Sequence, residues 1–235
     1  AVNLNNGQFK CLRSSCSVSG NMLTLAADFS WFSLGNDVDA YYRTERRQRY
    51  RKFGKMKPIK PKSAALAYLE SRKITAATAE RYQITVQIER ENVLVFPFLD
   101  EKGNMQFIKY RKTDFNPEKD SNKEWCEANC KPILFGMYQC NLENKTLIMT
   151  EGQLDSLSVA ESGIENAVSV PNGKNGFTWV PYCWDWLQNF NTLIVFGDCE
   201  RGSITLLDDM RRRFHGTVKA VRQQDYNCLL YTSPS

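Results

Sequence analysis

Strand-like and helix-like segments alternate through the last third of the chain, and this alternation constrains the fold more than any other sequence feature. The runs TLIMT, AVSV, TLIVF and TVKAVR are typical of short strands, and the helical patterns QLDSLSVAESG, WVPYCWDWLQNF and SITLLDDMRRRF separate them. Strands that are largely apolar on both faces and are joined by helices favour a parallel sheet with both faces covered. The sequence therefore predicts an α/β domain over residues 146–225.

A smaller α+β unit is expected over residues 63–145. The stretch SAALAYLESRKITAATAERYQIT has apolar side chains at helical spacing, with Ser63 and Thr75 as candidate N-caps, and predicts two short helices. The runs VLVFPFLD and MQFIKYRK flank the turn sequence DEKGN and predict an antiparallel hairpin. Residues 113–132 are polar and are expected to form a loop.

A basic stretch precedes this unit. Residues 36–62 are expected to form a linker, since Pro58 and Pro61 disfavour regular helix at its end. Lys and Arg dominate between Tyr41 and Lys62, where Glu45 is the only acid. Such a cluster can neutralise phosphates, which makes nucleic acid the first partner to consider, although a solvated basic linker is an equally good interpretation.

Composition limits the class of protein. With 235 residues, of which 42% are hydrophobic, the chain can form one sizeable core or two modest ones. No apolar run approaches the roughly 20 residues that cross a bilayer, and the N-terminus lacks the order of a secretory signal. We therefore expect an intracellular protein with no membrane contact. Its eight cysteines are expected to be free thiols or metal ligands.

Acidic residues follow two of the predicted parallel strands. Glu151 comes directly after TLIMT, and Asp155 lies one turn into the following helix. Asp198 and Glu200 come directly after TLIVF. Because sites in parallel sheets form beyond the carboxyl ends of the strands, we expect these acids to gather in one small region.

Crowded carboxylates are typical of a site for a hard divalent cation. They repel one another unless a cation compensates their charge, and magnesium, or manganese in its place, is the expected ion. Acids at these positions can also simply cap helices. For Asp155 the two interpretations are equally good, whereas for Glu151, Asp198 and Glu200 together capping is the weaker one.

Two segments resemble a known family signature. TLIMTEGQLDSLSVAESGIENAVSVPNG followed by TLIVFGDCERG is similar to the Toprim signature, an E-G-x-x-D element and a later D-x-D-x-G element, with Glu200 in place of the second Asp. FPFLDEKGNMQFIKYRK followed by KPILFGMY resembles the preceding half of the primase polymerase core. Over most of residues 7–225 the chain thus resembles Toprim-containing DNA primases of the DnaG-like and phage primase-helicase group.

The resemblance implies a Toprim-type parallel sheet, flanked by helices, that holds the catalytic centre. It assigns the catalytic metals to Glu151, Asp198 and Glu200, supported by the motif residues Gly152, Asp155 and Gly202. It also implies that Lys109, Arg111 and Lys112 face nucleotide phosphates or template, the alternative being an exposed basic strand face. Asn172 and Gly173 are expected either to approach a phosphate through their backbone amides or to form a simple loop turn.

The N-terminal segment GQFKCLRSSCSVSGN resembles the second knuckle of a zinc ribbon. Zinc needs four ligands, so Cys11 and Cys16 would form part of a site that is complete only in the full-length protein. We therefore expect a partial zinc-ribbon domain at residues 1–35. At the other end, Asp225 is a poor substitute for a further Toprim acid, and residues 226–235 are expected to be an unstructured or non-native tail.

The resemblance implies magnesium-dependent synthesis of short RNA primers from NTPs on single-stranded DNA during replication. A replicative helicase, fused or separate, is the expected partner, and the cytoplasm of a bacterial or phage-infected cell the expected location. Two alternatives remain. The chain could be a Toprim-type metal-dependent nuclease, or a non-catalytic module that binds single-stranded DNA, with Tyr41 and Tyr42 stacking on bases.

Overall fold

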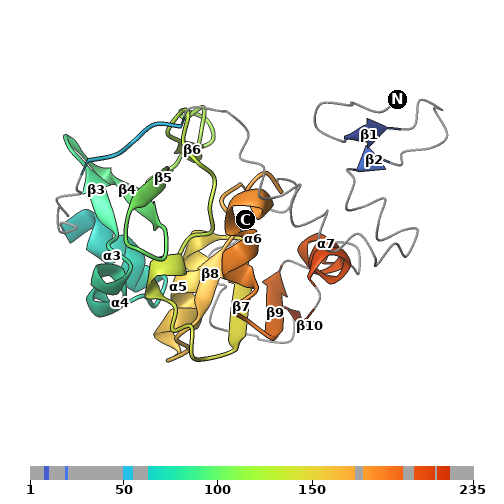
Figure 1. The fold of residues 1–235 in the computed structure, drawn as a ribbon. Coiled ribbons are helices and arrows are strands. Elements are labelled where there is room, and N and C mark those ends of the chain that lie inside the picture. Colours follow the sequence, from blue (N-terminus) through green and yellow to red (C-terminus); the bar gives the residue numbers. More distant parts are fainter. Residues whose placement is uncertain are drawn as a thin grey trace.

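The computed structural model describes residues 8–10, 19–20, 50–54, 63–172, 177–197, 204–214 and 216–222 (Figure 1). Near the N-terminus two short strands pair antiparallel, β1 (Phe9–Lys10) and β2 (Ser19–Gly20). The rest of the described chain is built on two four-stranded sheets. No helix among the described residues has the length and apolar character needed to span a bilayer.

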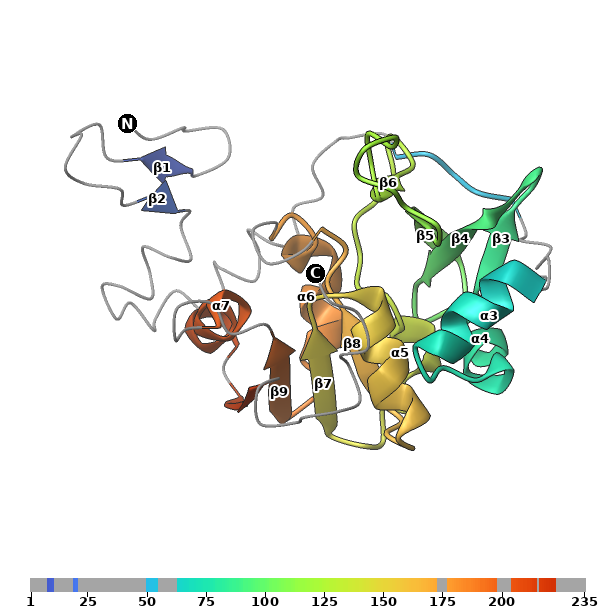
Figure 2. The ribbon, with the colours of Figure 1, turned by 180° about the vertical axis from the view of Figure 1, so that it is seen from behind.

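The C-terminal sheet is parallel, as the sequence predicted. Its strand order is β10-β9-β7-β8, and its members are β7 (Thr146–Thr150), β8 (Ala167–Ser169), β9 (Thr192–Gly197) and β10 (Thr217–Arg222). The connecting helices are α5 (Gln153–Glu161), α6 (Val180–Leu187) and α7 (Thr205–Arg213). Comparison of Figures 1 and 2 shows α5 on one face of the sheet and α6 on the other.

The change of face follows from chain direction. The chain moves one way from β7 to β8 and the opposite way from β8 to β9, so right-handed crossovers place α5 and α6 on opposite faces. As a result β7 and β9 are adjacent central strands with parallel register. Their carboxyl ends meet at one edge of the sheet, and the predicted α/β fold is confirmed.

The second sheet is antiparallel and has the order β3-β4-β5-β6. The predicted hairpin is present, and Asp100 Oδ1 stabilises its turn by accepting hydrogen bonds from the backbone N–H groups of Lys102 (3.0 Å) and Asn104 (2.8 Å). The predicted helix pair is also present, with Thr75 Oγ1 accepting the backbone N–H of Thr78 at 3.4 Å as an N-cap. The elements are α3 (Ser63–Ser71), α4 (Ala76–Arg81), β3 (Thr85–Gln87), β4 (Arg90–Leu99), β5 (Met105–Lys112) and β6 (Glu124–Cys126).

Strand β6 lies in the polar segment 113–132, and the prediction of a loop was wrong there. Its three residues, Glu124–Cys126, are too few to show an alternating apolar pattern. They form a strand because they pair with β5, Arg111 opposite Glu124 and Lys109 opposite Cys126. This pairing depends on a contact distant in sequence, which a local pattern does not reveal.

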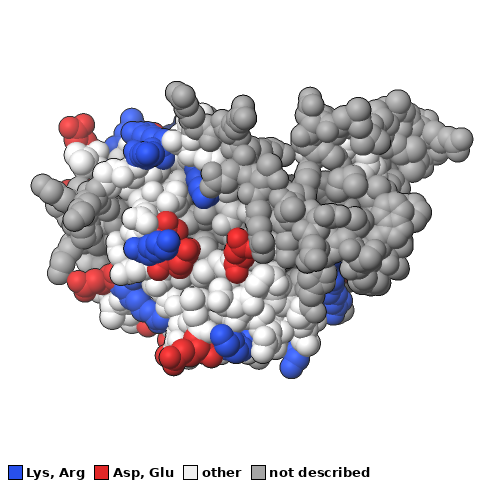
Figure 3. All heavy atoms as spheres, in the orientation of Figure 1, with Lys and Arg blue, Asp and Glu red and all other residues white. Residues whose placement is uncertain are grey.

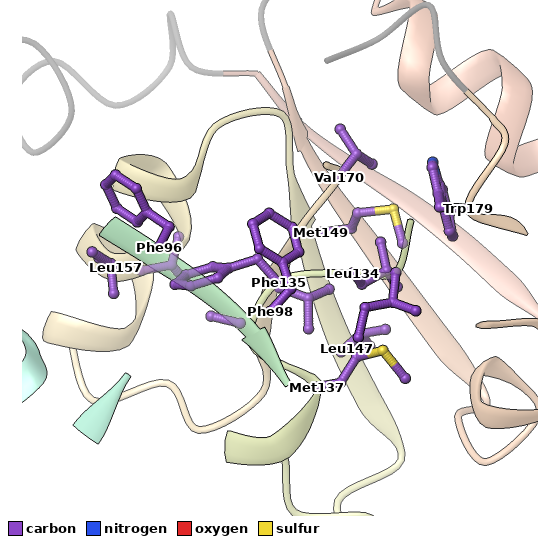
Figure 4. Packing of buried hydrophobic residues seen from close by; sticks show 14 of the residues in the cluster. Phe96, Phe98, Leu134, Phe135, Met137, Leu147, Met149, Leu157, Val170 and Trp179 are labelled. Atoms are coloured by element: carbon purple, nitrogen blue, oxygen red, sulfur yellow. The ribbon is translucent and has the colours of Figure 1, made fainter. Parts of the chain in front are cut away.

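The two sheets share one hydrophobic core, and Phe135 joins them. The Phe135 ring, 1% exposed, lies 5.9 Å from the ring of Phe96 and 5.3 Å from that of Phe98, both on β4. Its backbone meanwhile pairs with Ser169 of β8 through two hydrogen bonds of 2.9 and 3.1 Å. Figure 4 shows the ring between β4 and the strand that carries Leu147 and Met149.

The residue after Phe135 must be glycine for this contact to form. Gly136 has a φ of +89°, and a Cβ there would lie 2.6 Å from the carbonyl oxygen of Ala167. The chain then continues into a short 3-10 turn, η2 (Met137–Gln139), and enters β7. The close approach of the backbone at Gly136 therefore fixes how the antiparallel sheet sits against β8.

We predict that Phe135→Ala lowers the free energy of unfolding by about 3–5 kcal/mol, because it leaves a cavity at the joint between the sheets. Urea unfolding followed by circular dichroism measures this change. Ile88→Ala is the matched control: its side chain is 71% exposed, so a change within about 0.5 kcal/mol is expected. Equal losses in the two variants would contradict a joint at Phe135.

Candidate active site

The Glu151 carboxylate lies where β7 and β9 end. Glu151 directly follows β7, and Gly197 is the last residue of β9. Glu151 Oε1 is shielded from solvent and lies 3.1 Å from the point where a Cβ on Gly197 would be. The glycine therefore leaves the space that the carboxylate occupies, next to the position from which Asp198 continues the chain.

Asp155 caps the helix that follows β7. Its Oδ2 accepts a hydrogen bond from the backbone N–H of Gly152 at 3.2 Å. A Cβ on Gly152 would lie 2.6 Å from the same oxygen, so this geometry requires a glycine. The capping interpretation of Asp155 is therefore confirmed, while the side chain remains at the edge where Glu151 lies.

Several predicted site residues lie outside the described residues: Asp198, Glu200, Gly202, Gly173, Cys11 and Cys16. Within the described part of the chain, no three His, Cys, Asp or Glu side chains lie close enough together to hold a metal ion. The described residues thus provide one half of the expected acidic centre, the half that follows β7.

Lys109 and Arg111 project from the same face of β5 and share one carboxylate. Lys109 Nζ lies 2.7 Å from Glu124 Oε2, and Arg111 Nη1 pairs with the other oxygen of Glu124. Arg111 Nε also donates to the hydroxyl of Tyr68 at 2.9 Å. The side chains of Lys109 and Arg111 are 12% and 13% exposed, so they do not form a solvated basic strand face.

Glu124 is ionised at neutral pH because of these two cations. Burial raises the pKa of its carboxyl, but the charges and hydrogen bonds of Lys109 and Arg111 hold the pKa below its usual range. Two positive charges balanced by one negative charge leave a net positive charge at this face. That charge suits a bound phosphate.

A pocket of about 100 Å³ lies between Arg111 of this basic pair and the start of α5, at the acidic edge of the parallel sheet. Arg111 and Glu124 line it from the antiparallel sheet, and Gly152 and Asp155 line it from the start of α5. The structure therefore brings Arg111 next to the E-G-x-x-D element, although 40 positions or so separate them in the chain. Figure 3 shows Lys or Arg side chains lying directly beside Asp or Glu side chains on the described surface.

Asn172 and Lys112 have different positions relative to this pocket. Cys126 Sγ donates to Asn172 Oδ1 at 3.7 Å, and Cys126 pairs with Lys109, so Asn172 lies near the basic pair. Lys112 alternates to the other face of β5, where it lies 2.6 Å from Asp120 and lines a separate pocket. The structure does not bring Lys112 to the predicted site.

Sequence reasoning missed two residues of this site, Glu124 and Tyr68. Glu124 lies in a segment predicted to be a loop, and Tyr68 lies on α3 among apolar residues at helical spacing. Neither position carries a local signal, because each acts through Arg111. An acid opposite two cations becomes recognisable only when the register of β5 and β6 is known.

Comparison with known proteins links this geometry to one group. No family model matches the chain. It is 25% identical over 162 residues to the "Primase homolog protein" of Arabidopsis thaliana, covering 62% of this chain and 45% of that protein. The chain thus spans less than half the length of this curated relative.

Comparison with solved structures points to the same group of proteins. The primase fragment of the bacteriophage T7 primase-helicase protein superposes with a TM-score of 0.55 at 17% identity, covering 92% of this chain and 81% of the fragment. A DnaG primase catalytic domain bound to single-stranded DNA gives 0.54 at 16% identity, covering 87% and 76%. The chain has the fold of these catalytic cores, and the resemblance to Toprim-containing primases predicted from the sequence is confirmed.

We predict that Glu124→Gln lowers the free energy of unfolding by about 1–3 kcal/mol at neutral pH, because Lys109 and Arg111 lose their common counter-ion. The pKa of Glu124 is lowered in the folded state, so its contribution is complete above the ordinary value of about 4.3 and is lost as the pH falls through the lower folded value. The difference between wild type and variant should therefore shrink as the pH is lowered below that ordinary value.

Urea unfolding at a series of pH values measures this difference. Glu118→Gln is the matched control, since Glu118 is exposed in the segment before β6 and should change stability by less than about 0.5 kcal/mol at any pH. A stability difference for Glu124→Gln that stays constant across the acidic range would refute the ion-pair assignment.

Proposed function

We propose that this chain, which has the fold of DnaG and phage primase catalytic cores, is the catalytic part of a DNA primase that makes short RNA primers on single-stranded DNA during replication. One observation carries the proposal: the ends of β7 and β9 meet at the Glu151 carboxylate, and the α5 start beside it shares a pocket with Arg111. Acidic side chains at the end of the parallel sheet and a basic side chain of the antiparallel sheet thus lie together where a nucleotide polyphosphate could bind.

The residues at this edge fit a divalent metal. Glu151 offers carboxylate oxygens at the ends of the two central strands, and in the sequence Asp198 and Glu200 follow β9 directly. Such oxygen donors are those that Mg²⁺ or Mn²⁺ prefers. When bound, the ion would supply charge neutralisation on the phosphates and a lower pKa for the attacking hydroxyl. Zinc, if bound, would use Cys11 and Cys16 among its ligands.

The chain's own residues position the reactants. In the proposed reaction a nucleotide 3′-hydroxyl attacks the α-phosphate of an incoming NTP, forming a phosphodiester and releasing pyrophosphate. Lys109 and Arg111 would bind the polyphosphate, and Glu124 would hold both cations on one face of β5. Asn172 would contact the nucleotide from the loop after β8, beside Cys126. Fixed placement of this kind lowers the entropic cost of reaching the transition state.

We extend the proposal to organisation and partners. Residues 63–145 form the N-terminal subdomain of the primase core, residues 146–225 the Toprim domain, and residues 36–62 the linker from a zinc-binding domain. The similar T7 protein is a primase-helicase, which supports a replicative helicase, fused or separate, as the partner. NTPs are the substrates, and the protein acts in the cytoplasm.

We predict that Glu151→Gln lowers primer synthesis at least about 100-fold, because the amide removes the negative charge at the meeting point of β7 and β9. Asp198→Asn should have the same effect. The measurement is the yield of labelled oligoribonucleotide from NTPs on circular single-stranded DNA with magnesium. Circular dichroism should show an unchanged fold, and Glu118→Gln should retain full synthesis.

Synthesis by Glu151→Gln at the wild-type rate would reject the site. An additional reaction without NTPs separates primase from nuclease, since nicking of the circular DNA under that condition would favour a Toprim-type nuclease.

We predict that Gly197→Ala reduces primer synthesis at least about 10-fold, because the added Cβ would lie 3.1 Å from Glu151 Oε1 and 2.8 Å from Ile204 Cγ2 and would displace the carboxylate. Overpacking should also cost about 1–3 kcal/mol of stability. Gly54→Ala is the matched control, since no atom of the residues that the structure describes lies within 4 Å of its added Cβ. Equal synthesis by both variants would show that the Glu151 carboxylate does not act from this position.

A further inference from the structure

A pocket of about 420 Å³ opens on the outer face of the antiparallel sheet, the face opposite Lys109, Arg111 and Glu124. Residues on the starts of β4 and β6, the end of β5 and the intervening loop line it, chiefly Arg90, Asn92, Lys112, Asp120, Asn122 and Trp125. Its volume falls in the range of small-molecule sites and is sufficient for one nucleotide. The proposed catalytic reaction makes no use of this pocket.

Trp125 gives the pocket a fixed aromatic wall. Its ring stacks on that of Tyr110, with centroids 5.5 Å apart and an interplanar angle of 18°. The Tyr110 hydroxyl in turn donates to Glu127 Oε2 at 3.0 Å. Tyr110 thus covers one side of the indole and holds its orientation, while Trp125 still lines the pocket. Aromatic rings whose orientation is fixed in this way are the surfaces on which the bases of single-stranded nucleic acids stack.

The charges of the pocket match a single phosphodiester. Lys112 is paired with Asp120 at 2.6 Å, whereas Arg90 is exposed and forms no ion pair with any described residue. Lys112 also lies 3.9 Å from Asp114, which does not line the pocket, so its charge is balanced by two carboxylates and Arg90 is the cation that remains for a ligand. One available cation suits the single charge of a nucleotide within a strand better than the several charges of a free triphosphate. The amides of Asn92 and Asn122 add donors and acceptors for a base edge.

The basic stretch of the sequence is anchored beside this face. The Arg51 backbone N–H donates to the Asn129 carbonyl at 2.8 Å, and the Arg51 guanidinium pairs with Glu127, the same carboxylate that holds Tyr110. Figure 1 shows residues 50–54, in blue, passing close to β6. Two cations of the basic stretch, Arg51 and Lys52, therefore lie on a described segment that is joined to the Tyr110–Trp125 stack through Glu127.

From this arrangement we infer that the outer pocket binds one nucleotide of single-stranded DNA, its base against Trp125 and its phosphate at Arg90, outside the catalytic centre. The inference deepens the proposed function and rests on it for the identity of the strand as template. The pocket would hold the strand at a point remote from the acids, and Arg51 and Lys52 would neutralise neighbouring phosphates.

The test is the affinity of the chain for a fluorescent oligothymidylate, measured by anisotropy without magnesium or NTPs. Trp125→Ala should weaken binding by between about 5-fold and about 100-fold, since it removes a stacking platform. Trp125→Phe should restore most of the affinity, which a merely unfolded pocket would not allow. Arg90→Ala should weaken binding and reduce the slope of log affinity against log salt by about 1, the loss of one phosphate contact.

Two controls separate this inference from the proposed function. Lys145→Ala removes an equal charge beside the amino end of β7 and should bind DNA like the wild type. Glu151→Gln, which is expected to lose synthesis, should also retain DNA affinity. If Trp125→Ala and Arg90→Ala both bind the oligonucleotide as tightly as Lys145→Ala, the outer site is overturned and the primase proposal stands. The affinity of the same variants for the free nucleotide dTMP is measured alongside. If Trp125→Ala and Arg90→Ala lose dTMP binding but bind the oligonucleotide as the wild type does, the pocket binds a free nucleotide and the inference is overturned.

Discussion

The contact made by Phe135 holds the two sheets against each other. Its backbone extends the parallel sheet at Ser169, and its ring packs into the aromatic cluster of β4. One residue thus belongs to both sheets. Because protein interiors are densely packed and transmit position, the contact fixes the antiparallel sheet against the start of α5. Arg111 consequently shares a pocket with Gly152 and Asp155.

The two-residue period of β5 divides its cations between two environments. Lys109 and Arg111 face the parallel sheet and are held by Glu124, whereas Lys112 faces outward and is held by Asp120. In each case a carboxylate orients a flexible cation without neutralising the whole face. This arrangement restricts the side chains before a ligand binds, which reduces the entropy lost on binding. The inner and outer faces can therefore serve different parts of a nucleic-acid substrate.

Two glycines at the acidic edge also help to position side chains, but they do so by leaving space for a carboxylate and not by their charge. Gly152 admits the Asp155 cap, and Gly197 admits the Glu151 carboxylate. A Cβ at Gly152 would lie 2.6 Å from Asp155 Oδ2, and a Cβ at Gly197 would lie 2.8 Å from Ile204 Cγ2 and crowd Glu151 Oε1 at 3.1 Å. The glycine and the second acid of the E-G-x-x-D element are thus explained in part by packing, because the Asp155 cap needs a residue without a Cβ at position 152.

Local sequence patterns were enough to predict the parallel α/β domain, the hairpin, the helix pair and the position of Glu151 directly after a buried strand. These features follow from local periodicity, turn residues and caps, which act over a few positions and can be recognised in a single sequence. Contacts between distant segments were needed to show that Glu124–Cys126 form a strand, that Glu124 pairs with both Lys109 and Arg111, and that Lys112 and Trp125 line a separate outer pocket. Those features depend on which strand pairs with which, and in what register. A short polar strand carries no apolar pattern that would fix its partner, so long-range packing alone sets it.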